Sequence, residues 1–126
     1  MRRSSRGTPD DRDRLEYMLE AASEALRYVS NRTRADLDTD SMLLHAITYC
    51  IQVIGEAATQ VSDPGRLLAP ALPWREMAKM RNVMVHVYWG IDRDRVWETV
   101  RQDLPPLIQQ LQAALTAWPA TNPGSP

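Results

Sequence analysis

The stretch DSMLLHAITYCIQVIGEAATQV, residues 40–61, decides the fold of this chain. Its apolar side chains recur every three or four residues, the spacing of one face of an α-helix: Leu43, Ile47, Cys50, Ile51, Ile54, Ala58 and Val61. Because they occupy much of the circumference, we expect this helix to be central. Asp38 or Asp40 is expected to cap its N-terminus. A glycine inside a helix costs about 1 kcal/mol relative to alanine, so we expect Gly55 to allow another helix to approach closely.

The flanking sequence predicts a helix on each side of this one. Residues from about Asp10 to Thr33 are predicted to form the first helix, in which Asp10, Asp11 and Asp13 suit the positive N-terminal end and an apolar stripe follows. The stripe consists of Leu15, Met18, Leu19, Ala22, Leu26 and Val29. After residue 61, SDPGRLLAPALP breaks the pattern with three prolines and a glycine. Pro73 suits the first position of a third helix, from Trp74 to about Trp89, which Gly90 ends.

A fourth helix is predicted beyond this point, capped by Asp92 or Asp94. Its apolar positions are Trp97, Val100, Leu104, Leu107, Ile108, Leu111, Leu115 and Trp118. Pro105 and Pro106 should kink it or split it. The sequence therefore predicts an all-α, up-and-down bundle of four to five helices over residues 10–118, between disordered tails at residues 1–9 and 119–126.

Composition excludes several classes of protein. A chain of 126 residues with 44% hydrophobic and 25% charged residues suits one soluble domain. We expect a cytoplasmic protein with no membrane span, because no continuous apolar run reaches about 18 residues and no secretory signal follows the basic N-terminus. A net charge of −1 argues against a broadly basic nucleic-acid binder, so any such contact must be local. Cys50 is the only cysteine and is expected to be buried, and two histidines without a ligand cluster predict no metal site and no cofactor.

Arg81 and His86 stand out on the third helix. At about 100° per residue, Arg81 falls on an apolar stripe, with Trp74, Met77, Met84 and Tyr88. The second half of this helix has no clearly solvated face, which favours cover by a second copy of the chain. In one interpretation Arg81 pairs with a buried carboxylate such as Glu56, and His86 is an ordinary core histidine. In the other interpretation, the pair acts on a phosphodiester in a cleft between two subunits. Histidine exchanges protons near neutral pH, and arginine forms bidentate hydrogen bonds to phosphate oxygens. Periodicity alone leaves both interpretations open.

The segment from residue 54 to residue 107, which includes IGEA and LPWREMAKMRNVMVHVYWGIDRDRVWETVRQDLPPL, resembles the HepT toxins of the HEPN superfamily. Those proteins carry an arginine, four intervening residues, a histidine, one residue and a tyrosine. Arg81, His86 and Tyr88 match this motif, and Asn82 matches the asparagine after the arginine. The flanking IGEA, Pro73 with Trp74, Asp92, VW and DLPPL agree as well.

The resemblance implies a metal-independent endoribonuclease toxin of a HepT/MntA-type toxin–antitoxin pair, working as a homodimer with its two motifs across the interface. It implies that His86 is the general acid or base, that Arg81 binds the scissile phosphate, and that Asn82 orients the substrate or the histidine. It also implies that Tyr88 is adenylylated by an MntA-type nucleotidyltransferase antitoxin, which silences cleavage of the RNA substrate. Glu56 is then either a structural partner of Arg81 or a supporting group in the site, while His45 is an ordinary helix residue. The alternative is a non-catalytic helical dimer of the same superfamily that binds a nucleotidyltransferase partner or a nucleotide.

Overall fold

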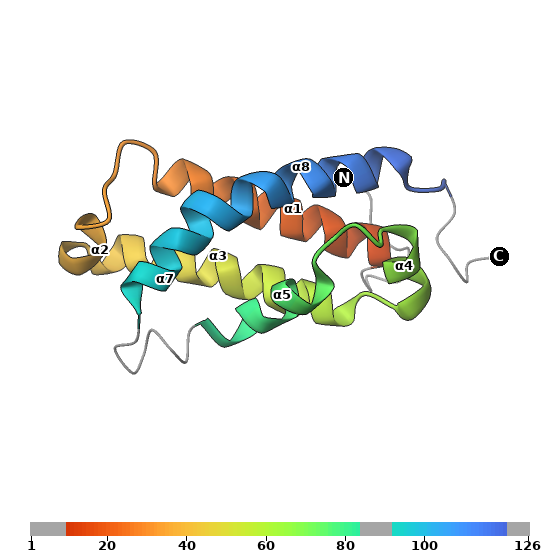
Figure 1. Cartoon of the computed structure of the whole chain (residues 1–126), viewed down its shortest axis with the longest axis horizontal. Helices are drawn as coiled ribbons and strands as arrows, with labels where there is room; N and C mark the ends of the chain where they lie inside the picture. Colours follow the sequence, from red (N-terminus) through yellow and green to blue (C-terminus); the bar gives the residue numbers. More distant parts are fainter. Residues whose placement is uncertain (1–9, 84–91, 121–126) are drawn as a thin grey trace.

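A computed structural model describes residues 10–83 and 92–120 of the chain. Within these ranges the chain is helical and contains no strand. The elements in chain order are α1 (Asp11–Tyr28), α2 (Asp36–Thr39), α3 (Ser41–Gln60), α4 (Asp63–Leu68), α5 (Trp74–Lys79), the 3-10 turn η1 (Met80–Asn82), α7 (Arg93–Glu98), the π-helical turn η2 (Thr99–Asp103) and α8 (Leu104–Ala117). Successive long segments run in opposite directions (Figure 1), which confirms the predicted all-α bundle.

Helix α3 is the central element. It packs against α1, α2, α5 and η1, and in Figure 1 it runs between α1 and α5. All seven apolar residues of its predicted stripe are buried, which confirms that pattern. Helix α3 is also long and apolar enough to cross a membrane, but half of its most apolar 18-residue stretch is buried inside the bundle. That burial is what the core helix of a bundle requires.

Side-chain caps fix where the first two long helices begin. The Asp10 carboxylate accepts a hydrogen bond of 2.8 Å from the Asp13 backbone N–H, and the Asp13 carboxylate accepts one of 3.0 Å from the Asp10 N–H. Asp40, one of the two predicted caps, accepts a hydrogen bond from the Leu43 N–H at 3.0 Å. The first helix ends at Tyr28, earlier than predicted, and Asn31 then takes a left-handed conformation with φ of 62°.

Two short helices were not predicted. Helix α2 fills part of the connection before α3, and α4 lies within the stretch expected to be irregular. In α4 the Ser62 hydroxyl caps the first turn by accepting a hydrogen bond from the Gly65 N–H at 3.1 Å. Pro64 is compatible with this helix because its missing N–H falls in the first turn, where no intrahelical partner exists.

The last helical segment accommodates its two prolines through a π-helical turn. Asp92 caps α7 with φ of 60° and accepts a hydrogen bond from the Arg95 N–H at 2.9 Å. Pro105 and Pro106 have no N–H to donate to carbonyls four residues earlier. The helix instead widens into the π-helical turn η2, where the Leu104 N–H donates a hydrogen bond to the Thr99 carbonyl. It then continues as α8. The predicted break is therefore this π-helical turn.

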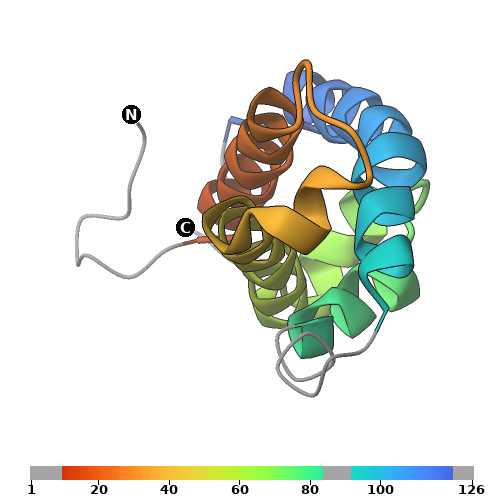
Figure 2. The same ribbon diagram turned by 90° about the vertical axis from the view of Figure 1, so that its left-hand side faces the viewer.

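Viewed end on, the helices surround one core (Figure 2). Residues from α1, α3, α5, α7, η2 and α8 contribute to it. The predicted tail at residues 1–9 lies outside the described residues. Of the tail predicted at residues 119–126, Pro119 and Ala120 are exposed and non-helical, and residues 121–126 are not described.

Candidate functional site

The structure describes part of the predicted motif. Arg81 and Asn82 lie on η1, and both side chains are exposed. His86 and Tyr88 fall within residues 84–91, outside the described residues, as do the second half of the predicted third helix and its Gly90 terminus. Asp92 follows directly as the cap of α7. The structure therefore describes only the arginine end of the motif.

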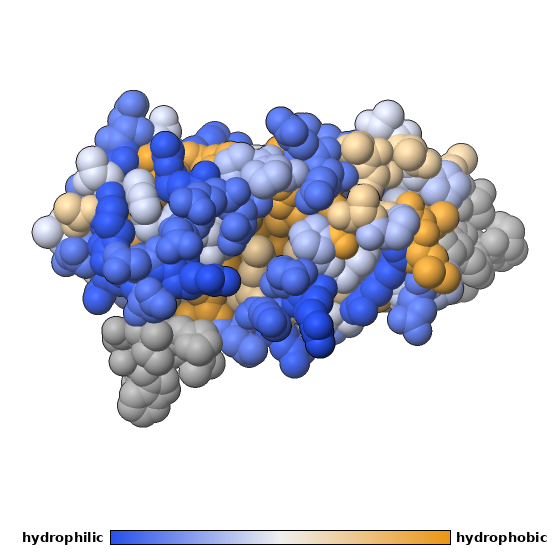
Figure 3. Space-filling view, viewed as in Figure 1, coloured by the Kyte–Doolittle hydropathy of each residue, from blue (hydrophilic) through white to orange (hydrophobic). Residues whose placement is uncertain are grey.

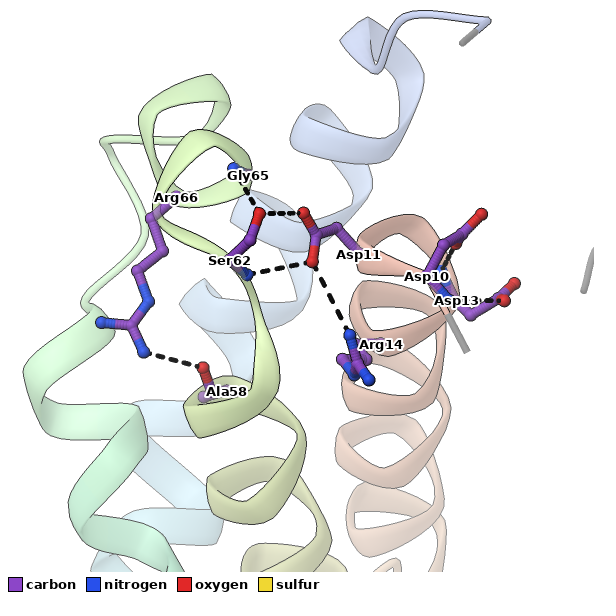
Figure 4. Close-up of polar contacts among 8 residues, drawn as sticks. All are labelled: Asp10, Asp11, Asp13, Arg14, Ala58, Ser62, Gly65 and Arg66. Carbon is purple, nitrogen blue, oxygen red and sulfur yellow. Dashed lines mark hydrogen bonds and ion pairs between the residues drawn. The ribbon is translucent and has the colours of Figure 1, made fainter. Parts of the chain in front are cut away.

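Helix α5 holds η1 in place through contacts at its beginning. The Trp74 ring nitrogen donates a hydrogen bond to the Ala69 carbonyl at 2.9 Å. The Arg66 guanidinium lies 5.6 Å from the centre of the Trp74 ring. It also donates a hydrogen bond to the Ala58 carbonyl at 3.2 Å, as Figure 4 shows. Met77 is fully buried. These contacts fix the start of α5 to α3 and α4 and its middle to the core.

The helix changes from α to 3-10 geometry at Met80, and Arg81 on this 3-10 turn is exposed. A continuous α-helix would place Arg81 near the face of Met77, which is why the sequence pattern placed it on the apolar stripe. That placement is wrong. The observed apolar face instead follows a period of three, through Met77, Met80 and Val83, all packed against the core. A 3-10 helix has 3.0 residues per turn, which matches this spacing.

Gly55 is where the motif touches the central helix. A Cβ added at Gly55 would lie 2.1 Å from the backbone nitrogen of Arg81 and 2.7 Å from its Cα and from the Met80 carbonyl carbon. Any side chain there would overlap the backbone of η1. The prediction that Gly55 allows a close approach is confirmed, and its neighbour is the motif arginine itself.

Glu56 does not form the buried pair that one interpretation proposed. Its side chain is exposed, as is that of Arg81. Among residues 10–83 and 92–120 no ion pair joins the two. That interpretation of the arginine is therefore wrong, although Glu56 follows Gly55 directly and lies on the helix that contacts η1. His45 is exposed on α3, in agreement with an ordinary helix residue.

A groove of about 710 Å³ opens beside the motif, between α5 with η1 on one side and α7, η2 and α8 on the other. Figure 3 shows apolar surface in the middle of this face, between hydrophilic side chains. The groove is lined by Ile51, Pro73, Glu76, Lys79, Met80, Val83, Asp92, Arg95, Val96, Thr99, Gln102, Asp103, Pro106, Leu107 and Gln110. Its size lies within the range of small-ligand sites, roughly 300–1,000 Å³. Acids slightly outnumber bases in its lining and Arg81 is not part of it, so it lacks the basic character that RNA phosphates require.

The groove was not predicted, because one wall of it is the π-helical turn, which the sequence pattern did not indicate. Cys50 is buried, and burial, followed by the negative charge of Glu24, raises the pKa of its thiol to about 11. Among the described residues no group of three or more His, Cys, Asp or Glu side chains is arranged to hold a metal ion.

The burial of Asp11 was not predicted from the sequence. The Asp11 carboxylate accepts hydrogen bonds from the Ser62 backbone N–H at 3.0 Å and from the Ser62 hydroxyl at 2.5 Å, and it lies 3.8 Å from the Arg14 guanidinium (Figure 4). The sequence indicated Asp11 only as a favourable charge at a helix N-terminus. With these partners, the acid joins α1 to α4 and has a structural role.

Comparison with known proteins gives consistent matches. A family model described as HepT-like, ribonuclease HepT-like, matches residues 18–114. A protein of Thermococcus cleftensis named "Probable ribonuclease HepT" is 36% identical over 93 residues, covering 71% of this chain and 84% of that protein. A protein of Methanocaldococcus jannaschii named as a "Putative RNase" is 27% identical over 95 residues, covering 75% and 87%. Another so named, from Caldanaerobacter subterraneus, is 29% identical over 101 residues, covering 80% and 90%. No solved structure matches significantly.

Proposed function

The chain belongs to the HepT-like ribonuclease family, and from that membership we propose that it is a metal-independent endoribonuclease toxin of a toxin–antitoxin pair. The observation that carries the proposal is the exposed arginine on η1, held against the central helix at Gly55. Arg81 begins the arginine–four residues–histidine–one residue–tyrosine spacing that includes His86 and Tyr88. An exposed guanidinium on a turn anchored by buried side chains is suited to binding a phosphodiester.

The proposed reaction uses the ribose of the substrate as the nucleophile. The 2′-oxygen attacks the phosphorus and the bond from phosphorus to the 5′-oxygen breaks, which leaves a 2′,3′-cyclic phosphate and a 5′-hydroxyl. His86 takes the proton of the 2′-hydroxyl or gives a proton to the departing 5′-oxygen. Arg81 stabilises the negative charge that develops on the phosphate oxygens, and Asn82 orients the substrate or the histidine.

We propose that the complete site forms in a homodimer, where the motifs of two subunits meet. Support comes from the outer face of α3, the helix that contacts η1. Met42 and Tyr49 on this face are 82% and 64% exposed, which is unusual for apolar side chains on a central helix. The RNA would then contact arginines from both subunits, a local positive site on a chain of net charge −1.

His86→Ala tests the catalytic assignment. Loss of a general acid or base typically lowers a rate by about 100-fold or more, so purified His86→Ala dimer should cleave RNA at least that much more slowly. His45→Ala is the matched control, because His45 is exposed on α3 and outside the motif. The wild-type protein should form cyclic phosphate ends in the presence of EDTA. An unreactive wild-type protein that still binds a nucleotidyltransferase or a nucleotide would instead indicate the non-catalytic dimer.

Arg81→Lys tests the phosphate contact. Lysine keeps the charge but not the planar fork, so cleavage should fall sharply. Arg75→Lys is the control, since Arg75 is an exposed arginine of α5 outside the motif. Equal activity of Arg81→Lys and wild-type protein would contradict phosphate binding by the fork.

We propose that regulation acts on Tyr88. An MntA-type nucleotidyltransferase antitoxin would join the tyrosine oxygen to the α-phosphorus of ATP, with release of pyrophosphate. A bulky, anionic adenylate on Tyr88 would compete with the RNA phosphate for the Arg81 guanidinium. Co-expression with the partner should add adenylate mass to the peptide that contains Tyr88, and Tyr88→Phe should prevent it. Adenylate mapped to another peptide would contradict this part of the proposal.

A further inference from the structure

Gly55 is the point at which the backbone of the motif touches the central helix. The atoms nearest a Cβ at this position are the Arg81 nitrogen, the Arg81 Cα and the Met80 carbonyl carbon. All are backbone atoms, which cannot rotate away as a flexible side chain can. Ordinary contact begins near 3.4 Å and the shortest distance here is 2.1 Å, so a methyl group would displace η1 by about 1.3 Å.

The Arg81 side chain depends on this backbone contact for its position. It is exposed, and no hydrogen bond or ion pair to another side chain holds it among residues 10–83 and 92–120. Met77, Met80 and Val83 pack against the core and fix the rotation of the turn. The distance of closest approach to α3 is set at Gly55, where only a hydrogen atom separates the two backbones.

We propose that Gly55 is a positioning residue for Arg81: the absence of a side chain at Gly55 sets where the Arg81 guanidinium meets the RNA phosphate. This inference rests on the proposed function, in which Arg81 binds that phosphate. A displacement of about 1 Å in a catalytic group lowers a rate by roughly 100-fold. The displacement expected from a single methyl group at Gly55 is of that size.

The test uses Gly55→Ala, which changes no charge but should remove the contact of Arg81 with the RNA phosphate. Each phosphate contact to a single strand contributes about 0.7 to the slope of log affinity against log salt concentration. Binding of a 2′-O-methylated RNA, which cannot be cleaved, is measured by fluorescence anisotropy across salt concentrations. Gly55→Ala should reduce the slope as much as Arg81→Ala does, and the double variant should show no further reduction. Cleavage of unmodified RNA should fall by about 100-fold.

Gly65→Ala is the matched control. A Cβ at Gly65 would also overlap its surroundings, but its neighbours are the side chains of Asp11 and Val61, 2.4 Å and 3.0 Å away, and not the motif. This variant should keep the wild-type salt slope and cleavage rate even where its melting temperature falls. A general loss of stability therefore cannot produce the result expected of Gly55→Ala.

The outcomes separate this inference from the proposed function. Wild-type cleavage by Arg81→Ala would refute the role of Arg81 in the proposed function. Loss of activity in Arg81→Ala with wild-type slope and cleavage in Gly55→Ala would overturn the positioning role alone. An equal further loss when the two changes are combined would also overturn it, because independent effects add.

A second variant decides the matter if Gly55→Ala does not fold. Met80→Ala removes a half-buried anchor of the same turn without adding volume, and Met80→Leu is its control. Met80→Ala should lower the salt slope and the cleavage rate, whereas Met80→Leu should keep both. Wild-type behaviour of Met80→Ala would overturn the proposal that the fixed position of this turn sets the arginine.

Discussion

Replacing Asp11 with alanine should loosen the junction between α1 and α4. The Asp11 carboxylate is 8% exposed and accepts two hydrogen bonds from Ser62, which lies 51 residues further along the chain. The Ser62 hydroxyl also accepts from the Gly65 N–H, so one side chain both caps α4 and contacts α1. The ion pair of Asp11 with Arg14 is longer, at 3.8 Å.

The contacts give the size of the expected effect. A hydrogen bond to a charged group contributes about 1.5–3 kcal/mol, but water replaces part of it at Ser62, which is exposed. The ion pair adds about 0–1 kcal/mol. Asp11→Ala should therefore lower the free energy of unfolding by roughly 2–4 kcal/mol. Ser62→Ala loses the shared hydrogen bond and a helix cap of about 1 kcal/mol, a total near 2–3 kcal/mol.

A double-mutant cycle measures the shared hydrogen bond. Urea unfolding of wild type, the two single variants and the double variant is followed by far-UV circular dichroism at one protein concentration, because dimerisation would make stability concentration-dependent. The double variant should lose about 1–2 kcal/mol less than the sum of the single losses. Asp63→Ala, an exposed acid of α4, is the control and should change stability by about 0.5 kcal/mol or less. Additive losses, or a loss from Asp11→Ala as small as the control's, would refute the reasoning.

Three further predictions concern the fold. The hydrogen bond from the Leu43 N–H, and then that from Arg32, lower the pKa of Asp40. A carboxyl with a lowered folded-state pKa adds stability that is present above its ordinary pKa of 3.8 and is lost as the pH falls through the lower value. The difference in stability between wild type and Asp40→Asn should therefore narrow below about pH 4. Acid titrations followed by circular dichroism measure this difference. A thiol pKa of about 11 should make native Cys50 react with a disulfide reagent at pH 8 about 100-fold more slowly than in urea, and equal rates would contradict its burial. Met77→Ala should cost about 2–5 kcal/mol in urea unfolding, because Met77 is fully buried, and a loss under 1 kcal/mol would contradict its anchoring role.

The long helices could be predicted because their signal is repeated along many residues. The seven apolar positions predicted for the central helix agree on one face, and all seven are buried. Caps add a local chemical signal, since only a short polar side chain before the first turn satisfies the free N–H groups there. Asp40 and Asp92 were each named as one of two candidate caps, and both form the expected hydrogen bond.

Features that depend on distant contacts could not be predicted in the same way. Helices α2 and α4 have four and six residues, too few for a period to be visible. The burial of Asp11 depends on Ser62, from a different part of the sequence. The groove depends on how α7 and η2 lie against α5, which no local pattern specifies. At the motif, Gly55 was identified as a point of close approach, but the partner backbone became known only from the packing of η1.

The change of helix type at Met80 explains how one turn can be both anchored and chemically available. In a continuous α-helix, Arg81 would lie about 40° from Met77 around the axis, close to the buried face. With 3-10 geometry from Met80 onward, this angle grows to about 60°, while Met80 and Val83 come together on the buried side. The apolar side chains then hold the turn to the core and the guanidinium reaches solvent without burying its charge, which would be costly unless a partner compensated it. The exposed arginine coincides with this change of helix type, and the glycine beneath it allows that turn to lie directly on α3.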